Sequence, residues 1–164
     1  MMFSPALIGR AAAVLGGYRE RAWRIATAES CTGGLVAGLL TEIPGSSDVI
    51  ERGFVTYSNE AKVGLLGVPG ELLAEHGAVS DPVARAMAEG ALLRSNAHVA
   101  VSITGVAGPG GGTARKPVGL VHFGIAAEGR PAGHLERRYG DLGRSAIRLA
   151  AVEDALELLE SALR

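Results

Sequence analysis

The segment Ile25-Ala26-Thr27-Ala28-Glu29-Ser30-Cys31-Thr32-Gly33-Gly34 decides the class of fold. Its first half, Ile25–Ala28, has the length and apolar character of a buried strand, and its second half is a polar turn that contains glycine. Directly after the turn, apolar residues recur every three or four positions from Leu35 to Ile43, which predicts a helix that ends before Pro44. A strand that leads through a turn into a helix is the repeating unit of α/β proteins, and ligand sites commonly lie at such strand ends.

The same alternation continues on both sides of this segment. Apolar spacing after Pro5 predicts a first helix that ends near Gly16 and Gly17, and a final helix follows Arg144. Four further strands are predicted around Val49–Tyr57, with a bulge near Gly53, and over His98–Thr104, Leu120–Ala126 and Leu135–Tyr139. The last two can pair as an antiparallel hairpin. We therefore expect one α/β domain over residues 1–164, a three-layer α/β/α sandwich with a mixed sheet of about five strands.

Composition and charge exclude several functional classes. With 164 residues and 48% hydrophobic content, the chain is long enough for one domain with a core and short for two. The formal net charge is -1 and basic residues form no run, so nucleic acid is not an expected partner. Apolar runs stop short of the roughly 18 residues of a membrane helix, so no membrane partner is expected. A single cysteine, Cys31, and the lack of a signal peptide favour a cytoplasmic location.

Common metal and nucleotide motifs are absent from the sequence. The four histidines have no metal-ligand spacing, and Cys31 alone cannot complete a zinc site; the histidines are His76, His98, His122 and His134. The glycine-rich segment fits neither the P-loop pattern nor the dinucleotide-binding fingerprint. We therefore expect no metal and no organic cofactor.

Ser30 is the first candidate for chemistry, because it lies where a predicted strand becomes a helix. The helix start would offer unpaired N–H groups and the positive end of the helix dipole to an oxyanion or a phosphate. Gly33 and Gly34 would leave room for that approach. Position alone also fits a simple N-cap role for Ser30 or Thr32.

Lys62 is the candidate base for Ser30. A lysine that is desolvated against the sheet can lose its proton near neutral pH and activate a hydroxyl. A lysine on a predicted helix is otherwise a solvated surface charge, so only a contact with Ser30 would give it this role.

Other residues are suited to binding a ligand. The segment Thr104–Thr113 contains five glycines and follows a buried strand, so it could fold over a ligand with its amides pointing inward, or form a flexible turn. Arg144 and Arg148 could each reach a phosphate. Tyr57 could be a core residue or a stacking surface for an aromatic ring.

Four blocks together resemble the C-terminal domain of CinA proteins: Thr27–Gly34, Tyr57–Lys62, Gly77–Ser80 and Thr104–Thr113. The resemblance extends from about Ala6 to the final helix. It implies a nicotinamide-nucleotide amidohydrolase that converts nicotinamide mononucleotide to nicotinate mononucleotide and ammonia in pyridine nucleotide (NAD) recycling. In that family the larger members carry an additional N-terminal domain, so this chain resembles the stand-alone form.

The resemblance also implies roles for individual residues. Ser30 matches the nucleophile and Lys62 its base, as a Ser-Lys dyad. The residues that match substrate-binding positions are Thr32, Gly33, Gly34, Tyr57, Asn59, Thr104, Gly105, Gly108, Gly110, Gly111 and Arg144. The expected partner is the small pyridine nucleotide, and for a small metabolic enzyme a homodimer or larger homo-oligomer is expected.

Two alternatives stay open at this stage. Cys31 could be the nucleophile, because a thiolate at a helix N-terminus is more reactive than a hydroxyl. The chain could also be a nucleotide-binding module that keeps the pocket without turnover, since a fold does not prove an activity.

Overall fold

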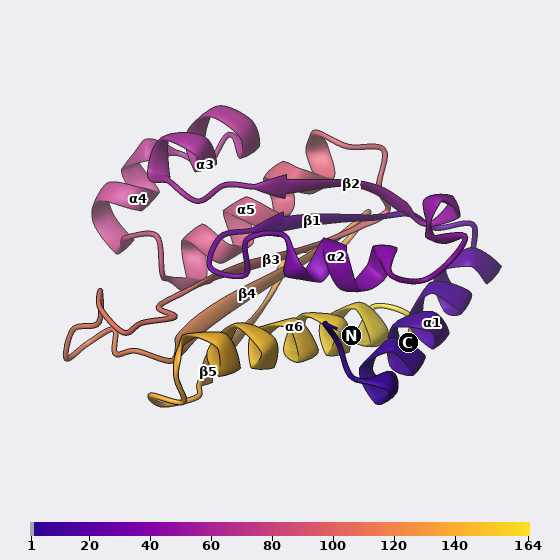
Figure 1. Ribbon diagram of the computed structural model, residues 1–164. Coiled ribbons are helices and arrows are strands. Elements are labelled where there is room, and N and C mark those ends of the chain that lie inside the picture. Colours follow the sequence, from indigo (N-terminus) through magenta and orange to yellow (C-terminus); the bar gives the residue numbers. More distant parts are fainter. Residues whose placement is uncertain (1) are drawn as a thin grey trace.

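Five strands form a mixed sheet that lies between two layers of helices in the computed structural model, which describes residues 2–164 (Figure 1). The strand order across the sheet is β2-β1-β3-β4-β5. The predicted three-layer α/β/α sandwich with a mixed sheet of about five strands is therefore confirmed. The strands are β1 (Ile25–Glu29), β2 (Ile50–Val55), β3 (Val99–Gly105), β4 (Leu120–Ala127) and β5 (Gly133–Arg138).

Six α-helices cover the two faces of this sheet. They are α1 (Pro5–Glu20), α2 (Leu35–Thr41), α3 (Asn59–Leu66), α4 (Gly70–His76), α5 (Asp81–Leu93) and α6 (Arg144–Ser161). One core packs α1, α2 and α6 against the sheet, and the other packs α3, α4 and α5 against the opposite face. Ser30 and Lys62 therefore come from opposite sides of the sheet, because Ser30 leads into α2 and Lys62 belongs to α3.

Strand direction brings three chain segments to one edge of the sheet. β1 runs parallel to both β2 and β3, whereas β4 is antiparallel to β3 and to β5. The carboxyl ends of three parallel strands meet at the same edge, which is the usual place for a site in such sheets. Ser30 follows β1, Thr56 follows β2 and Gly105 ends β3, so these residues share that edge.

Two local predictions from the sequence are wrong. The first helix does not end at Gly16 and Gly17 but continues to Glu20, because Tyr18 is fully buried and its hydroxyl donates to the Leu159 carbonyl at 2.9 Å. This tertiary packing outweighs the low helix propensity of glycine. The irregularity of β2 lies near its start, opposite Ile25, and not at Gly53.

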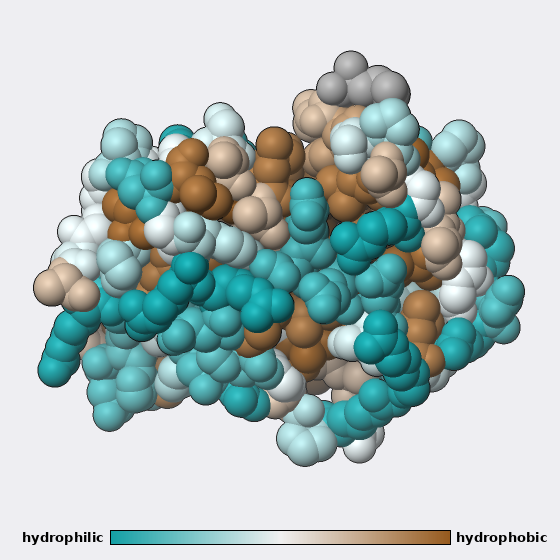
Figure 2. All heavy atoms as spheres, turned by 90° about the horizontal axis from the view of Figure 1, so that it is seen from below, coloured by the Kyte–Doolittle hydropathy of each residue, from teal (hydrophilic) through white to brown (hydrophobic). Residues whose placement is uncertain are grey.

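Polar residues dominate the outer surface on the side of the sheet that α1 and α6 cover. Figure 2 shows the face seen from below, over α1, α6 and β5, where hydrophilic side chains cover the middle and apolar ones gather in separate patches.

Within residues 2–164, no helix combines the length and the apolar character that are needed to cross a lipid bilayer.

Glycine allows α5 to approach the sheet closely, and this gives a first prediction. A Cβ added at Gly124 of β4 would lie 2.3 Å from the Ala84 carbonyl oxygen of α5, which is inside any permitted contact. We expect Gly124→Ala to lower the free energy of unfolding by about 1–3 kcal/mol, measured by urea denaturation, because the helix must move outward. The control is Gly9→Ala on α1, where no atom lies within 4 Å. That change should raise stability by about 0.5–1 kcal/mol, and equal stabilities for the two variants would contradict the close packing.

Candidate active site

The edge where β1, β2 and β3 end contains a pocket of about 310 Å³. Small-molecule sites commonly have volumes of about 300–1,000 Å³, so its size suits a small ligand. Ten of the thirteen residues expected from the sequence line it: Ser30, Tyr57, Asn59, Lys62, Thr104, Gly105, Gly108, Gly110, Gly111 and Arg144. Residues from four distant parts of the chain are thus brought together here.

Lys62 and Ser30 are in direct contact at the base of this pocket. The Lys62 Nζ donates to Ser30 Oγ at 3.0 Å and to the Thr56 carbonyl oxygen at 2.7 Å. Only 1% of the Lys62 side chain is exposed, and no ion pair within residues 2–164 involves it. Burial lowers the pKa of Lys62, and the opposing effect of the nearby Cys31 thiol is smaller. The amine is therefore suited to take a proton from the Ser30 hydroxyl.

Local structure around α3 sets the position of Lys62. Ser58 is the N-cap of this helix, and its hydroxyl accepts a hydrogen bond from the Ala61 amide at 3.0 Å. The Lys62 amide donates to the Ser58 carbonyl, and the Lys62 carbonyl accepts from Val68. Because the short segment between β2 and α3 contains Thr56, the same connection that places Lys62 also supplies a carbonyl to hold its amine.

A buried carboxylate occupies the N-terminus of α2. Glu29, the last residue of β1, is 1% exposed. Its Oε1 accepts from Thr32 Oγ1 at 2.7 Å and from the Val36 amide at 2.9 Å, and its Oε2 accepts from the Ala37 amide at 3.1 Å. Two amides of the helix start that was expected to offer unpaired N–H groups are thus already bonded to this carboxylate.

Thr32, Gly33 and Gly34 do not line the pocket, although they were expected there. Thr32 is fully buried and bonded to Glu29. Gly33 has a φ of 59° and Gly34 a φ of 102°, left-handed conformations that glycine adopts without strain. These three residues shape the turn that carries Ser30.

The turn leaves three backbone amides without an acceptor in residues 2–164, those of Cys31, Thr32 and Gly34, and the first of them directly follows the nucleophile candidate. The Ser30 amide donates to Ile103 and the Gly33 amide donates to the Ser30 carbonyl. Cys31 also lines the pocket, so its N–H lies next to the reacting hydroxyl and is available to a ligand oxygen.

Arg144 bridges the mouth of the pocket. Its Nη1 donates to the Gly108 carbonyl at 2.7 Å and its Nη2 donates to the Tyr57 hydroxyl at 2.8 Å. Both Arg144 and Tyr57 are exposed, Tyr57 at 61%. Two backbone hydrogen bonds close the base of the glycine-rich loop. The Val106 amide donates to the Leu120 carbonyl, and the Gly119 amide donates to the Val106 carbonyl, so the loop forms one wall of the site.

Several residues of the site were not expected from the sequence. Ala78 and Val79 line the pocket without having been named as site residues. Cys31, the alternative nucleophile, lines it as well, with Val106 and Ala107 from the predicted Thr104–Thr113 segment. Burial raises the pKa of the Cys31 thiol to about 11. Ala78 and Val79 belong to the Gly77–Ser80 block. This block is part of the resemblance to the CinA C-terminal domain, and that was the sequence signal that could have placed them in the site. The Thr56 carbonyl is a backbone group and leaves no signature in the sequence.

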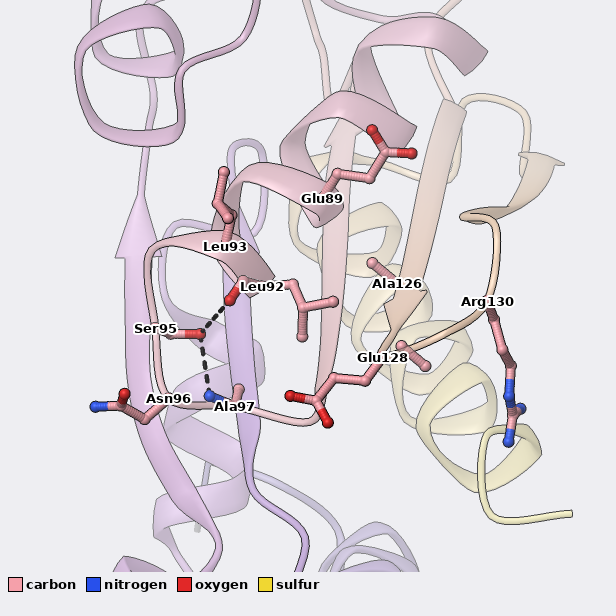
Figure 3. A pocket seen from close by; sticks show the side chains of 10 residues that line it. Glu89, Leu92, Leu93, Ser95, Asn96, Ala97, Ala126, Glu128 and Arg130 are labelled. Atoms are coloured by element: carbon pink, nitrogen blue, oxygen red, sulfur yellow. Dashed lines mark hydrogen bonds between the residues drawn. The ribbon is translucent and has the colours of Figure 1, made fainter.

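A larger cavity of about 680 Å³ lies at the other end of the sheet, between the end of α5 and the β4–β5 connection (Figure 3). Its polar residues include Glu89, Asn96, Glu128 and Arg130. The Ser95 hydroxyl there is engaged with its own loop, through the Leu92 carbonyl and the Ala97 amide. The cavity has no nucleophile in contact with a base, so the smaller pocket is the better candidate for an active site.

Metal chemistry has no evident ligand set in the described residues. Within residues 2–164, no group of three or more His, Cys, Asp or Glu side chains is arranged to hold a metal ion.

Known proteins are similar to this chain in sequence and in structure. The family model described as CinA C-terminal domain matches residues 9–163. The chain is 53% identical to the CinA-like protein of Anaeromyxobacter sp. (strain K) and 55% identical to that of Synechococcus sp. (strain RCC307), over 92% and 91% of its length. It spans 36% of the length of each of these curated relatives.

Solved structures with the same fold cover nearly the whole chain. The competence/damage inducible protein CihA from Agrobacterium tumefaciens is similar with a TM-score of 0.97 and 52% identity, over 99% of this chain and 98% of that one. A CinA superfamily protein from Klebsiella pneumoniae is similar with a TM-score of 0.90 and 34% identity, over 96% and 97% of the two chains.

The role of Glu29 gives a second prediction. In Glu29→Gln, the side-chain NH₂ group would face a backbone N–H of α2, so a buried donor would lose its acceptor. We expect the free energy of unfolding to fall by about 1–3 kcal/mol in urea denaturation. Glu42→Gln is the control, because Glu42 is exposed at the end of the same helix. A Glu29→Gln protein as stable as the Glu42→Gln protein would show that the carboxylate is not needed to cap α2.

Proposed function

Because the chain belongs to the CinA C-terminal domain family, we propose that it hydrolyses the carboxamide of nicotinamide mononucleotide, with Ser30 as nucleophile and Lys62 as its base. The products are nicotinate mononucleotide and ammonia. The observation that carries the proposal is the 3.0 Å contact between Lys62 Nζ and Ser30 Oγ inside a pocket. A general base must lie within about 2.6–3.2 Å of the group that it deprotonates. The nucleotide itself is the substrate that the family resemblance implies.

The reaction begins with attack of Ser30 Oγ on the carboxamide carbon. Lys62 Nζ takes the hydroxyl proton as the new O–C bond forms, and it passes this proton to the amide nitrogen as the C–N bond breaks. Ammonia leaves, and the nicotinate group stays on Ser30 as an ester. Water, deprotonated by Lys62, then hydrolyses the ester and restores the hydroxyl. Thr56 supports both steps, because its carbonyl fixes the direction of the amine.

The tetrahedral intermediate carries a negative oxygen that needs donors. The unpaired amide of Cys31 is the proposed donor, since Cys31 follows the nucleophile directly and lines the pocket. A donor of this kind contributes roughly 3–4 kcal/mol in comparable enzymes.

Binding of the nucleotide is assigned to the pocket mouth. Arg144 carries the positive charge there and is proposed to bind the phosphate, with Tyr57 as a stacking surface for a ring. Arg148 is not proposed as a phosphate ligand, because Arg144 lines the pocket and Arg148 does not. The amides of the loop from Gly105 to Gly111 are further donors.

Ser30 is preferred over Cys31 as the nucleophile. A thiol whose pKa is raised to about 11 carries very little thiolate at neutral pH, and the thiolate is the reactive form. The amine is also directed at Ser30 Oγ.

Ammonia release by purified protein tests the proposed chemistry. With nicotinamide mononucleotide as substrate, Ser30→Ala should abolish release and Lys62→Met should lower kcat by about 10²–10⁴-fold, because each removes a member of the dyad. Cys31→Ala should keep most of the activity. Activity in Ser30→Ala together with its loss in Cys31→Ala would assign the nucleophile to the thiol. A wild-type protein that binds the nucleotide without releasing ammonia would instead be a binding module.

The pKa of Lys62 gives a prediction of pH dependence. Only the neutral amine can act as a base, so kcat/KM should rise with pH through the pKa of Lys62, which is lowered from its ordinary value of 10.5. Between the lowered pKa and 10.5, unfolded Lys62 binds a proton that folded Lys62 does not bind. The free energy of unfolding should therefore rise with pH across this window, and this rise should be missing in Lys62→Met. Urea denaturation at several pH values measures it, and identical pH profiles of the two proteins would contradict a lowered pKa.

A further inference from the structure

We infer that Arg148 is a positioning residue for the reaction, holding the turn that follows Ser30 through the Cys31 and Thr32 carbonyls so that Ser30 and the Cys31 amide beside it keep their places at the pocket. The inference rests on the proposed function and adds a residue that touches neither the pocket nor the reacting atoms.

Arg148 reaches the turn from α6. Its Nε donates to the Cys31 carbonyl at 3.0 Å and its Nη2 donates to the Thr32 carbonyl at 3.2 Å. No carboxylate in residues 2–164 pairs with this guanidinium. Its positive charge is therefore directed at two successive backbone carbonyls.

Peptide geometry converts this contact into a direction for the amides. In a trans peptide group the C=O and the N–H point to opposite sides. Because the Cys31 carbonyl points toward α6, the Thr32 N–H of the same group points away from α6. The Ser30 carbonyl is bonded to the Gly33 amide inside the turn, so the Cys31 N–H points out of the turn. The side opposite α6 is the side of α3, from which Lys62 reaches Ser30.

The turn needs such a clamp because glycine makes its backbone permissive. Gly33 and Gly34 can adopt many conformations, so a fixed set of amide directions must be imposed from outside. Gly33 also lies next to the guanidinium, since a Cβ at this position would be in ordinary van der Waals contact with Arg148 Nη2, at 3.4 Å.

Steady-state kinetics of Arg148→Ala tests the inference. We expect kcat for ammonia release from nicotinamide mononucleotide to fall by about 10- to 100-fold, with KM changed by less than about twofold, because misplaced donors affect the transition state more than the bound substrate. Low, non-denaturing guanidinium should restore part of kcat in this variant. The matched control is Arg21→Ala, because Arg21 also donates to two carbonyls, those of Gly17 and Leu163, away from the site. The control should keep kcat, and guanidinium should not change it.

A second measurement works without the nucleotide. The rate at which a serine-directed fluorophosphonate labels the protein should be lower in Arg148→Ala than in Arg21→Ala. If wild-type protein releases no ammonia but this difference is found, the proposed substrate is wrong and the inference about Arg148 stands. Equal labelling of the two variants, or a rise in KM at unchanged kcat in Arg148→Ala, would overturn it; the second result would make Arg148 a binding residue.

Discussion

Among residues 2–164, no carboxylate pairs with the buried amine of Lys62, and the site depends on this isolation. Desolvation of a lysine disfavours its charged form, so the amine is stable only if it gives up its proton or finds strong acceptors. The structure supplies two acceptors, the Ser30 hydroxyl and the Thr56 carbonyl. A carboxylate at the same distance would hold the amine protonated and remove its basicity. The missing ion pair is therefore what allows the contact with Ser30 to be chemically useful.

Opposite charges hold the turn that carries Ser30 from two sides. The Glu29 carboxylate accepts from amides at the start of α2, and the Arg148 guanidinium donates to the carbonyls of Cys31 and Thr32. Within residues 2–164, the amides of Cys31, Thr32 and Gly34 are the backbone donors of the turn that keep no acceptor. In the proposed reaction the donor to the negative oxygen is therefore the Cys31 amide just after the nucleophile, and not the start of α2.

The sequence predicted those parts of the site that depend on strand and helix order. Apolar periodicity placed Ser30 at the end of a strand, and parallel strands brought it to the same edge as Gly105. The sequence could not predict which amides after Ser30 remain available. Glu29 accepts hydrogen bonds from the Val36 and Ala37 amides through a side-chain conformation that no sequence pattern encodes. The predicted end of α1 near Gly16 was wrong for a similar reason, since the last turn of this helix is stabilised by the burial of Tyr18 against α6.

Glycine content explains how a protein with only 4% aromatic residues can bury a lysine. A Cβ at Gly90 of α5 would lie 2.0 Å from the Leu66 carbonyl at the end of α3, so α3 rests directly on α5. α5 in turn rests on the sheet at Gly124. These two backbone contacts bring α3 close enough to the sheet edge for the Lys62 stem to be enclosed and its amine to reach across to Ser30. Larger side chains at either glycine would lift α3 and admit water, and the pKa of the Lys62 amine would then rise toward its ordinary value.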